Sequence, residues 1–538
     1  MAKVVCADLR CICRAKTDIP KTGWHRIAAS HITEQGDEQM EQNQDQKTST
    51  RIAGIPETDA ERLTALFAHD ATFRLRRLNR PMDPSDAAAV CILCHLDGMT
   101  NGLLISESIL KPLETYLVNP SHESSAEKIA ASAVSNAEVQ FAETIEELSD
   151  AMQNGDCVLL AAKGALIFSV KGWMKRSTQE PDNEKVLRGP REGFIESALT
   201  NVSLLRRKLQ TTELQVEDAT FGRLTNTKTY LCYLKSRVNP KILAELKRRL
   251  QRIQMDGVLD SNYLLEQIRD APRTPFKTVG VTERPDIAAA KLLEGRIALI
   301  VDGSPCVLTI PYLFIENFQV NDDYYTNYIF ATINRYLRMI GFFLTVSVPA
   351  IYVAIVTYHQ EILPPALLVS ISASRQGVPF PTIVEMVLLL LAFEILREAS
   401  IRMPNNIGQA LSIVGALVLG QAAVEAKLVS APMVIIIALT GTTSLLTPPL
   451  GGAEIMVRSM LLALSAMLGM VGFILGDVVL FFHLGAMQTF GVPYLSLAPD
   501  RAGNQRHDSF VRARWGKLRY RKLFADAQVS SGKEGEKR

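Results

Sequence analysis

The sequence predicts an α/β region in two small subdomains, followed by an all-α polytopic membrane domain with four to six spans and a basic tail. The first observation is length, because 538 residues exceed what one ordinary core holds. The second is an uneven distribution of charge. Only twelve of the 158 positions from Ile340 to Leu497 are charged, whereas 21% of the whole chain is charged. Such a stretch is typical of membrane helices, and the more charged stretch before it is typical of a water-soluble region.

The near balance of charge excludes one broad class of function. The chain has 58 Lys and Arg against 56 Asp and Glu, so it lacks the basic excess of a nucleic-acid binder. The first thirty residues hold no uninterrupted apolar run of the signal-peptide kind, because Asp8, Arg10 and Arg14 interrupt it. We therefore expect the soluble region to stay in the cytosol.

The predicted boundaries divide the chain into five parts. They are 1–57 for a disordered extension, 58–175 and 182–325 for the two subdomains, 335–497 for the membrane domain and 498–538 for the tail. The extension includes a polar run from Gln35 to Gln46, which cannot bury enough apolar surface to order itself. Either Met1 or Met40 can be the true start.

The first subdomain is predicted from its turns. An apolar run, Ala87–Leu96, ends in the turn Asp97-Gly98. An acidic helix is expected over Ala126–Asp150. Two apolar arms, Val158–Ala162 and Ala165–Val170, flank Lys163-Gly164 and predict a β-hairpin.

The second subdomain is predicted in the same way. A turn at Arg188–Phe194 is followed by a helix, Thr229–Lys235 alternates like a strand, and Lys241–Ile253 has helical spacing. Two further strands, Arg296–Val301 and Cys306–Ile310, are joined by a turn-rich tetrapeptide. There is no phosphate-loop or dinucleotide motif, and we expect no cofactor.

The cysteines and histidines do not predict a metal site. Cys91 and Cys94 have the spacing of half a zinc site, but the sequence has no second CxxC or HxxxH to complete it. Ordinary buried thiols are the expectation. Without a nucleophile motif or a phosphate motif, the sequence offers no catalytic constellation, so we do not expect an enzyme.

Four charge-free or nearly charge-free segments are predicted as spans: Ile340–Tyr358, Ile383–Leu396, Ile407–Val424 and Leu428–Thr447. Arg335 and Arg338 precede the first and indicate a cytosolic start. The segment Ala366–Ser374 between prolines is expected to lie in the interface or to re-enter.

The end of the membrane domain is harder to divide. Asp477 interrupts the apolar block Ser459–Val492 without a loop long enough to separate two spans. The tail from Arg501 to Arg538 has eleven Lys and Arg against four Asp and Glu, which predicts a cytosolic location. Two cytosolic ends require an even number of spans, and both four and six remain open.

The polar residues of these spans are the candidate pore-lining or gating positions. They are Gln409, Ser412 and Gln421, with the bulky wall residues Val414 and Leu417, and Glu385 on a neighbouring span. Packing between helices and lining of a water-filled path are both open for the span Ile407–Val424. A carboxylate in a bilayer is energetically costly, so Glu385 is expected either to pair with another residue within the bundle or to have a functional role. Glu394 is expected to pair with Arg397.

Several segments together resemble the A subunit of GerA-type spore germinant receptors, over about Thr58 to Pro499. They are RGPREGF at Arg188–Phe194, TERPD at Thr282–Asp286, LEGR at Leu293–Arg296, VDGSP at Val301–Pro305, PFP at Pro379–Pro381, Phe393–Ala399, Ile407–Val424 and FGVPY at Phe490–Tyr494.

The resemblance implies a subunit of a nutrient-sensing complex in the inner membrane of a dormant bacterial spore. Its partners would be a transporter-like B subunit, thought to bind the germinant, and a lipoprotein C subunit. The A subunit is thought to form a homo-oligomer with an ion-conducting pore. Two alternatives stay open: a stage V sporulation AF-type paralogue that amplifies ion release, and a secondary transporter with a regulatory cytosolic domain.

Within the resemblance, Arg188, Gly189, Pro190, Arg191 and Glu192 form a candidate structural or coupling motif. Gly189-Pro190 is expected to set a turn, and Arg191-Glu192 to orient a helix at a subunit or subdomain contact. An arginine in such a contact is not replaceable by lysine, because its planar fork bonds in two directions.

Overall fold

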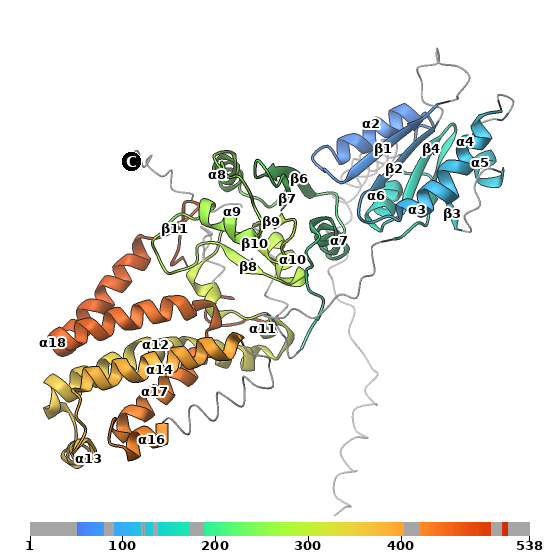
Figure 1. Ribbon diagram of the computed structural model, residues 1–538. Helices are drawn as coiled ribbons and strands as arrows, with labels where there is room; N and C mark the ends of the chain where they lie inside the picture. The colour runs from blue at the N-terminus through green and yellow to red at the C-terminus, as the bar shows by residue number, and fades with distance from the viewer. Residues whose placement is uncertain are drawn as a thin grey trace, which may run out of the picture.

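The computed structural model describes residues 51–79, 91–119, 122, 124–132, 138–172, 184, 188–402, 420–496 and 508–514. These form two sheet units followed by a helical domain (Figure 1). The predicted order of an α/β region before an all-α region is therefore confirmed. The predicted extension 1–57 lies almost entirely outside the described residues, as does most of the tail.

The first unit is a five-stranded antiparallel sheet in the order β1-β2-β4-β5-β3. The strands are β1 (Phe73–Leu78), β2 (Cys91–Leu96), β3 (Val139–Ala142), β4 (Cys157–Ala161) and β5 (Gly164–Phe168). Helices α2 (Pro56–Leu66) and α6 (Ile145–Gln153) pack on one face. The π-helix η1 (Ile105–Leu110), α4 (Lys111–Leu117) and α5 (Ala126–Ser132) pack on the other, with the short helix α3 (Gly102–Leu104) leading into them.

The predicted hairpin of this unit is confirmed. Strands β4 and β5 pair from Cys157 opposite Phe168 to Ala161 opposite Gly164, and Lys163 turns the chain with φ +65°. The prediction of one acidic helix over Ala126–Asp150 is wrong. The segment forms α5, then β3, then α6, because β3 pairs with β5 and the Thr144 hydroxyl caps α6 by accepting from the Glu147 N–H at 3.2 Å.

The second unit repeats this topology. Its order β6-β7-β9-β10-β8 is the first order with five added to each number, and every pairing is again antiparallel. The strands are β6 (Leu214–Phe221), β7 (Thr227–Leu234), β8 (Gly280–Thr282), β9 (Ile297–Val301) and β10 (Val307–Ile310). Helices α7 (Ala198–Lys208) and α10 (Pro285–Leu293) cover one face, and α8 (Pro240–Gln251) and α9 (Ser261–Ile268) cover the other. The predicted pair of strands joined by a short turn corresponds to β9 and β10, and the predicted helix Lys241–Ile253 corresponds to α8. Both predictions are confirmed.

A buried ion pair and a short strand bridge join the two units. Arg206 of α7 donates to Asp70, and both side chains are almost completely buried. Asp70 also bridges to Val216 of β6, and the Ala71 N–H donates to the Val216 carbonyl at 2.8 Å. The two sheets are therefore held directly to each other.

The helical domain starts after the second sheet. The short elements η2 (Phe314–Phe318) and α11 (Asp322–Tyr325) lead into α12 (Tyr328–Tyr358), and η3 (Gln360–Ile362) leads into α13 (Pro365–Arg375). The chain continues through α14 (Thr382–Arg402), α16 (Gly420–Glu425), α17 (Ala431–Ser444), η5 (Pro448–Leu450) and α18 (Gly451–Ala486). Strands β11 (Gln488–Thr489) and β12 (Val492–Pro493) follow.

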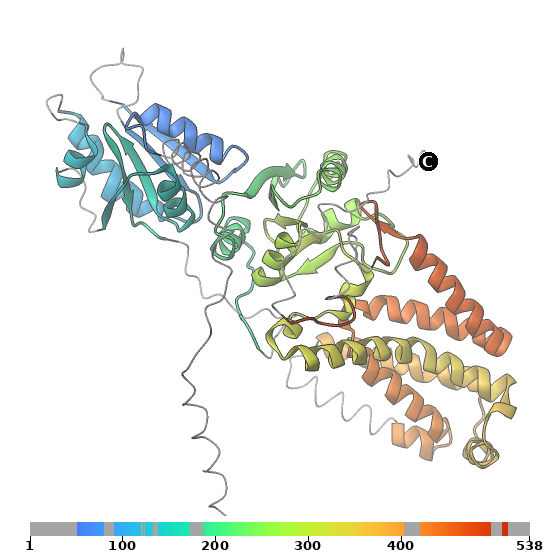
Figure 2. The same ribbon diagram turned by 180° about the vertical axis from the view of Figure 1, so that it is seen from behind.

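Helix α18 reverses direction near its middle. Gly469 has φ +62° and ψ −140°, which interrupts the helix and divides it into two arms that Figures 1 and 2 show meeting at one end. The sequence instead predicts an interruption of the apolar block at Asp477, eight residues later, because that residue is charged. A conformation open essentially to glycine alone makes the turn instead.

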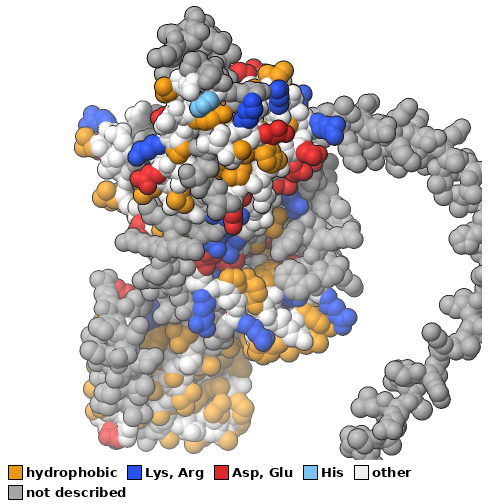
Figure 3. Space-filling model, turned by 90° about the vertical axis from the view of Figure 1, so that its right-hand side faces the viewer, with side chains coloured by type: hydrophobic (Ala, Val, Ile, Leu, Met, Phe, Trp, Pro, Cys, Tyr) orange, Lys and Arg blue, Asp and Glu red, His pale blue; other side chains and the backbone are white. Residues whose placement is uncertain are grey.

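The count of four to six spans stays a prediction. Within the described residues, the stretches Tyr328–Tyr358 and Pro448–Ala486 are long and apolar enough to cross a membrane. The predicted span Leu428–Thr447 is too long: α17 has 14 residues, since it begins after Ser430 and ends before Pro448-Pro449. Most of the predicted span Ile407–Val424 lies outside the described residues. In Figure 3 the helical part carries mostly hydrophobic and uncharged side chains, whereas charged ones gather over the sheets.

Candidate coupling site

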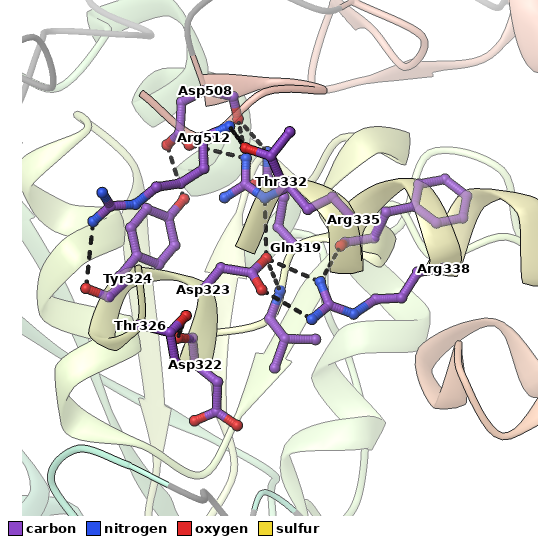
Figure 4. A network of polar contacts seen from close by, with 12 residues as sticks. Gln319, Asp322, Asp323, Tyr324, Thr326, Thr332, Arg335, Arg338, Asp508 and Arg512 are labelled. Carbon is purple, nitrogen blue, oxygen red and sulfur yellow. Dashed lines mark hydrogen bonds and ion pairs between the residues drawn. The ribbon is translucent and has the colours of Figure 1, made fainter. Parts of the chain in front are cut away.

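A buried carboxylate of α11 holds the start of α12. Asp323 of α11 is 1% exposed and receives two arginines of α12 (Figure 4). Arg335 Nε donates to it at 3.0 Å, and Arg338 donates with both terminal nitrogens at 2.9 Å. The arginines lie three residues apart, so they share one face of the helix. A forked pair of this kind fixes orientation as well as distance.

The C-terminal segment Asp508–Arg514 completes the same cluster. Arg335 Nη1 donates to the Asp508 carboxylate at 3.0 Å and to its carbonyl at 2.8 Å. The Tyr324 hydroxyl donates to the other carboxylate oxygen at 2.8 Å, and Gln319 donates to the carbonyl at 2.7 Å. Burial raises the pKa of Asp508, although Arg335 and Tyr324 favour its charged form. We call Asp323, Tyr324, Arg335, Arg338 and Asp508 the α12 junction.

Arg512 closes the cluster from the other side. Its backbone N–H donates to the Thr332 hydroxyl at 3.2 Å, and its guanidinium lies 5.8 Å from the centre of the Tyr324 ring. Two carboxylates and three arginines therefore meet within one small region. The result is that the C-terminal segment, α11 and α12 are tied at one point.

A second ion pair lies on the other side of α11. Arg284 is 1% exposed and makes a forked contact with Asp286 at 3.0 and 2.6 Å. Asp286 also accepts from Asn321 at 2.6 Å and from the Tyr325 hydroxyl at 2.7 Å. Burial would raise the pKa of Asp286, but the hydrogen bonds from Arg284 and Tyr325 outweigh it and hold the pKa below its usual value. The segment TERPD therefore contacts the short helix that precedes α12.

The candidate motif Arg188–Glu192 reaches this pair. The Pro190 carbonyl accepts from Arg284 at 3.0 Å. Gly189 has φ +120°, and a Cβ there would lie 2.6 Å from the Tyr325 ring. Glu192 instead pairs with Arg207 at 2.7 Å and Lys208 at 3.3 Å on α7. The structure thus brings Gly189 to Tyr325 of α11 and Pro190 to Arg284, and the four residues from Arg188 to Arg191 are exposed.

The segment LEGR anchors the connection from β10 to the helices. Glu316 of η2 is buried and receives Arg296 at 2.6 Å and Lys291 at 2.8 Å. Arg296 also donates to the Pro311 carbonyl at 2.6 Å. Burial would raise the pKa of Glu316, but the charges of Arg296 and Lys291 hold it below its usual value.

The segment FGVPY brings the end of α18 back to the sheet unit. The Phe490 N–H donates to Asp270 at 2.8 Å, and the Arg249 guanidinium lies 4.3 Å from the centre of the Phe490 ring. Tyr494 is completely buried, and its carbonyl accepts from the Phe314 N–H at 3.1 Å. Both α12 and the second arm of α18 are therefore attached to the same sheet unit.

The candidate residues within the helices are only partly described. Gln409, Ser412, Val414 and Leu417 lie outside the described residues. Gln421 is exposed and donates to Glu425 at 3.0 Å.

Two glutamates of α14 are held inside the bundle. Glu385 is completely buried and accepts from the backbone and hydroxyl of Ser430 at 3.2 and 2.9 Å. Glu394 pairs with Arg397 at 2.7 Å, as predicted, and also with Arg458 of α18 at 2.5 Å.

The described part of the chain contains no group of three or more His, Cys, Asp or Glu arranged to hold a metal ion. Cys91 and Cys94 are buried in β2, and burial raises the pKa of the Cys94 thiol to about 12. At neutral pH this thiol is therefore uncharged, as expected of an ordinary buried thiol.

Sequence reasoning missed the α12 junction as a unit. Arg335 and Arg338 were interpreted only as charges before a span, and Asp323 and Asp508 were not singled out. Two arginines three residues apart, soon after the pair Asp322-Asp323, were the available local signal. Asp508 gave no local signal, because its partner Arg335 lies 173 residues earlier.

The chain is similar to known proteins over most of its length. Residues 61–524 match the family described as Bacillus/Clostridium GerA spore germination protein. The chain is 40% identical over 448 residues to spore germination protein KA of Bacillus subtilis (strain 168), which covers 82% of each chain. It is 34% identical over 454 residues to spore germination protein GerLA of Bacillus cereus, covering 83% of this chain and 92% of that protein.

One solved structure and one further relative complete the comparison. The crystal structure of the N-terminal domain of the A subunit of the Bacillus megaterium spore germinant receptor GerK3 covers 49% of this chain and 98% of its own, at 26% identity and a TM-score of 0.38. The membrane protein YfkQ of Bacillus subtilis (strain 168), which is described as uncharacterized, is 39% identical over 428 residues, or 79% of this chain and 83% of that protein.

Proposed function

The chain belongs to the GerA family of Bacillus/Clostridium spore germination proteins, and from this membership we propose that it is the A subunit of a germinant receptor in the inner membrane of a spore. Relatives named as spore germination proteins match most of its length, which supports the proposal. Two helices of sufficient length and apolarity support a membrane location. The sheet units and the tail would lie on the cytosolic side, facing the spore core.

The proposed role is to couple germinant sensing to ion release. A transporter-like B subunit would bind the nutrient, a lipoprotein C subunit would complete the receptor, and this chain would form a homo-oligomer that conducts ions. The observation that carries the role is the α12 junction. Because Asp286 holds α11 to the sheet unit and Asp323 holds α11 to the arginines of α12, a movement of the sheet unit would move the start of α12 with it.

The pore is proposed to be lined by the span Ile407–Val424. Its polar residues Gln409, Ser412 and Gln421 would face a shared axis, with Val414 and Leu417 forming a hydrophobic constriction. Glu385 holds the neighbouring helix α14 against Ser430 at the start of α17.

Deletion of the chain tests the proposed function. Spores without it should be viable but unresponsive to one class of nutrient, while germination by a surfactant or by dipicolinate stays normal. Ion release and optical density are measured for each trigger. An equal loss of response to every trigger would overturn the receptor role and favour a downstream component such as an AF-type paralogue.

A further inference from the structure

A small cavity lies at the end of the helical domain that is farthest from the sheets. It has a volume of about 270 Å³ and is formed by the end of α12, by η3 and by α13. Figures 1 and 2 both show α13 at this far end. Its lining combines apolar side chains with a few polar ones, as small-molecule sites do. The polar ones are Gln360, Ser372, Arg375 and Gln376.

Arg375 is the charged group of this cavity, and its buried Nε makes no hydrogen bond within the described part of the chain. Its side chain is 26% exposed, and the nearest carboxylate oxygen, Glu385 Oε1, lies 3.9 Å from its Nε. Neither of these two buried atoms makes a hydrogen bond within the described part of the chain. A guanidinium has five N–H donors in a fork that matches an oxyanion with two oxygens. The geometry of Arg375 therefore favours a ligand that brings such oxygens.

Behind Arg375 lies a polar centre that reaches two more helices. Glu385 of α14 is completely buried, and its other oxygen accepts from the N–H and hydroxyl of Ser430, which precedes α17. The hydroxyl of Tyr352 on α12 is also buried and lies close to Arg375, Glu385 and Ser430. Arg375 Nε and Glu385 Oε1, the two atoms of the ion pair, are thus left without a hydrogen bond in the described part of the chain. Such atoms are costly unless a second arrangement satisfies them.

We infer that this cavity binds a small oxyanion, a carboxylate or a phosphate group, through Arg375. The bound oxygens would take the N–H donors of Arg375, with the Ser372 hydroxyl and the Gln376 amide as neighbouring donors. The anion would compete with Glu385 for the guanidinium and so weaken the attraction between α13 and α14. Because Glu385 also holds Ser430, occupation of the cavity would be felt at the start of α17.

Direct binding tests the inference without relying on germination or ion conduction. The full chain is purified in a maltoside detergent, because its head group is uncharged and does not compete with an anion. It is then titrated calorimetrically with acetate and with inorganic phosphate. The wild type should bind at least one of them. Arg375→Gln should weaken the binding about ten-fold, because a charge-assisted hydrogen bond is lost. Arg397→Gln is the matched control, since that side chain is 25% exposed and also lies in the helical domain.

A second variant tests the competition with Glu385. Glu385→Gln removes the competing charge and should tighten binding several-fold, roughly in line with a loose ion pair. Hydrogen exchange of residues 360–378, which should slow when the anion is added, gives a readout if this variant is unstable. Equal affinity in the wild type and in Arg375→Gln, or no binding of either anion by the wild type, overturns the inference.

The source of the oxyanion is decided in nanodiscs. If the cavity takes a lipid head group, phosphatidylglycerol should protect residues 360–378 from exchange in the wild type and not in Arg375→Gln. If it takes a free anion, acetate or phosphate should protect them equally in nanodiscs with and without phosphatidylglycerol. Both results support recognition of an oxyanion by Arg375, and protection that is independent of Arg375 contradicts it.

Discussion

At the scale of single residues, Asp323 balances two positive charges that would otherwise have no compensating negative charge on α11. Arg335 is completely buried, and Arg338 makes a forked contact with the same carboxylate. A buried ion pair adds little to the free energy of folding compared with an apolar contact of similar size. Loss of one partner is costly, because the other charge stays buried without compensation.

Asp323→Asn should therefore destabilise the chain by about 3–5 kcal/mol. The measurement is the midpoint of denaturation of the full chain in detergent. Asp322→Asn, one residue earlier in the same helix, is the control and should change the midpoint little. Equal midpoints for Asp323→Asn and the wild type would show that Asp508 alone can hold Arg335.

Glu316 gives stability a definite dependence on pH. Its folded pKa is lowered, so its contribution is present above the usual glutamate pKa of about 4.3 and is lost as the pH falls through the folded value. Glu316→Gln should be less stable than the wild type at neutral pH, and the difference should shrink below about pH 4. Unfolding free energies measured from pH 3 to pH 7 test this, with Glu61→Gln on the exposed face of α2 as control. A difference that stays constant with pH would contradict it.

At the scale of elements, the reversal within α18 depends on one glycine. Gly469 has a positive φ, and a Cβ there would lie 2.8 Å from the His359 ring. An uninterrupted helix of 36 residues would be about 54 Å long, and its end could not return to the sheet unit.

Gly469→Ala should strain the turn by about 1–3 kcal/mol and loosen the contacts of Phe490 and Tyr494. Faster hydrogen exchange over residues 488–495 is the expected result. Gly485→Ala is the control, because a Cβ there meets nothing within 4 Å. Unchanged exchange in Gly469→Ala would mean that the packing of the arms, and not the glycine, sets the reversal.

Local patterns predicted the elements whose determinants are local. The hairpin at Lys163-Gly164 and the pair β9–β10 follow from alternation and turn residues within a few positions. The predicted helix Ala126–Asp150 failed because β3 is specified by its pairing with β5, about 25 residues later, and not by its own pattern. The reversal at Gly469 was missed because the apolar sequence continues through it.

The candidate site was predictable only where its contacts are short in sequence. The forked contact of Arg284 with Asp286 lies within one segment, whereas Arg338 reaches Asp323 across 15 residues and Arg335 reaches Asp508 across 173. Burial decides which charges pair, and a single sequence does not show burial.

At the scale of the whole molecule, one strand order is used twice. Both sheet units have the order 1-2-4-5-3 when each is numbered from its own first strand, and the helices cover corresponding faces. Among the described residues, the second unit holds α11 through Asp286 and receives the segment that follows α18 through Asp270. The first unit contacts it through Asp70 and Arg206.

Removal of the C-terminal segment tests how these parts are held together. Truncation before Asp508 should speed hydrogen exchange in α11 and in the first turns of α12, because Arg335 and Tyr324 lose a partner. Truncation after Arg514 keeps those contacts and should leave the exchange unchanged. Equal exchange in the two truncated chains would show that Asp323 alone fixes the start of α12.

The position of Asp508 also fixes the order of events during biosynthesis. Domains form from the N-terminus while the chain is still being made. Asp323 and Arg335 can meet as soon as α12 has left the ribosome, but Asp508 follows every described helix, including both arms of α18. The α12 junction can therefore close completely only in a chain whose described helices have all been synthesised.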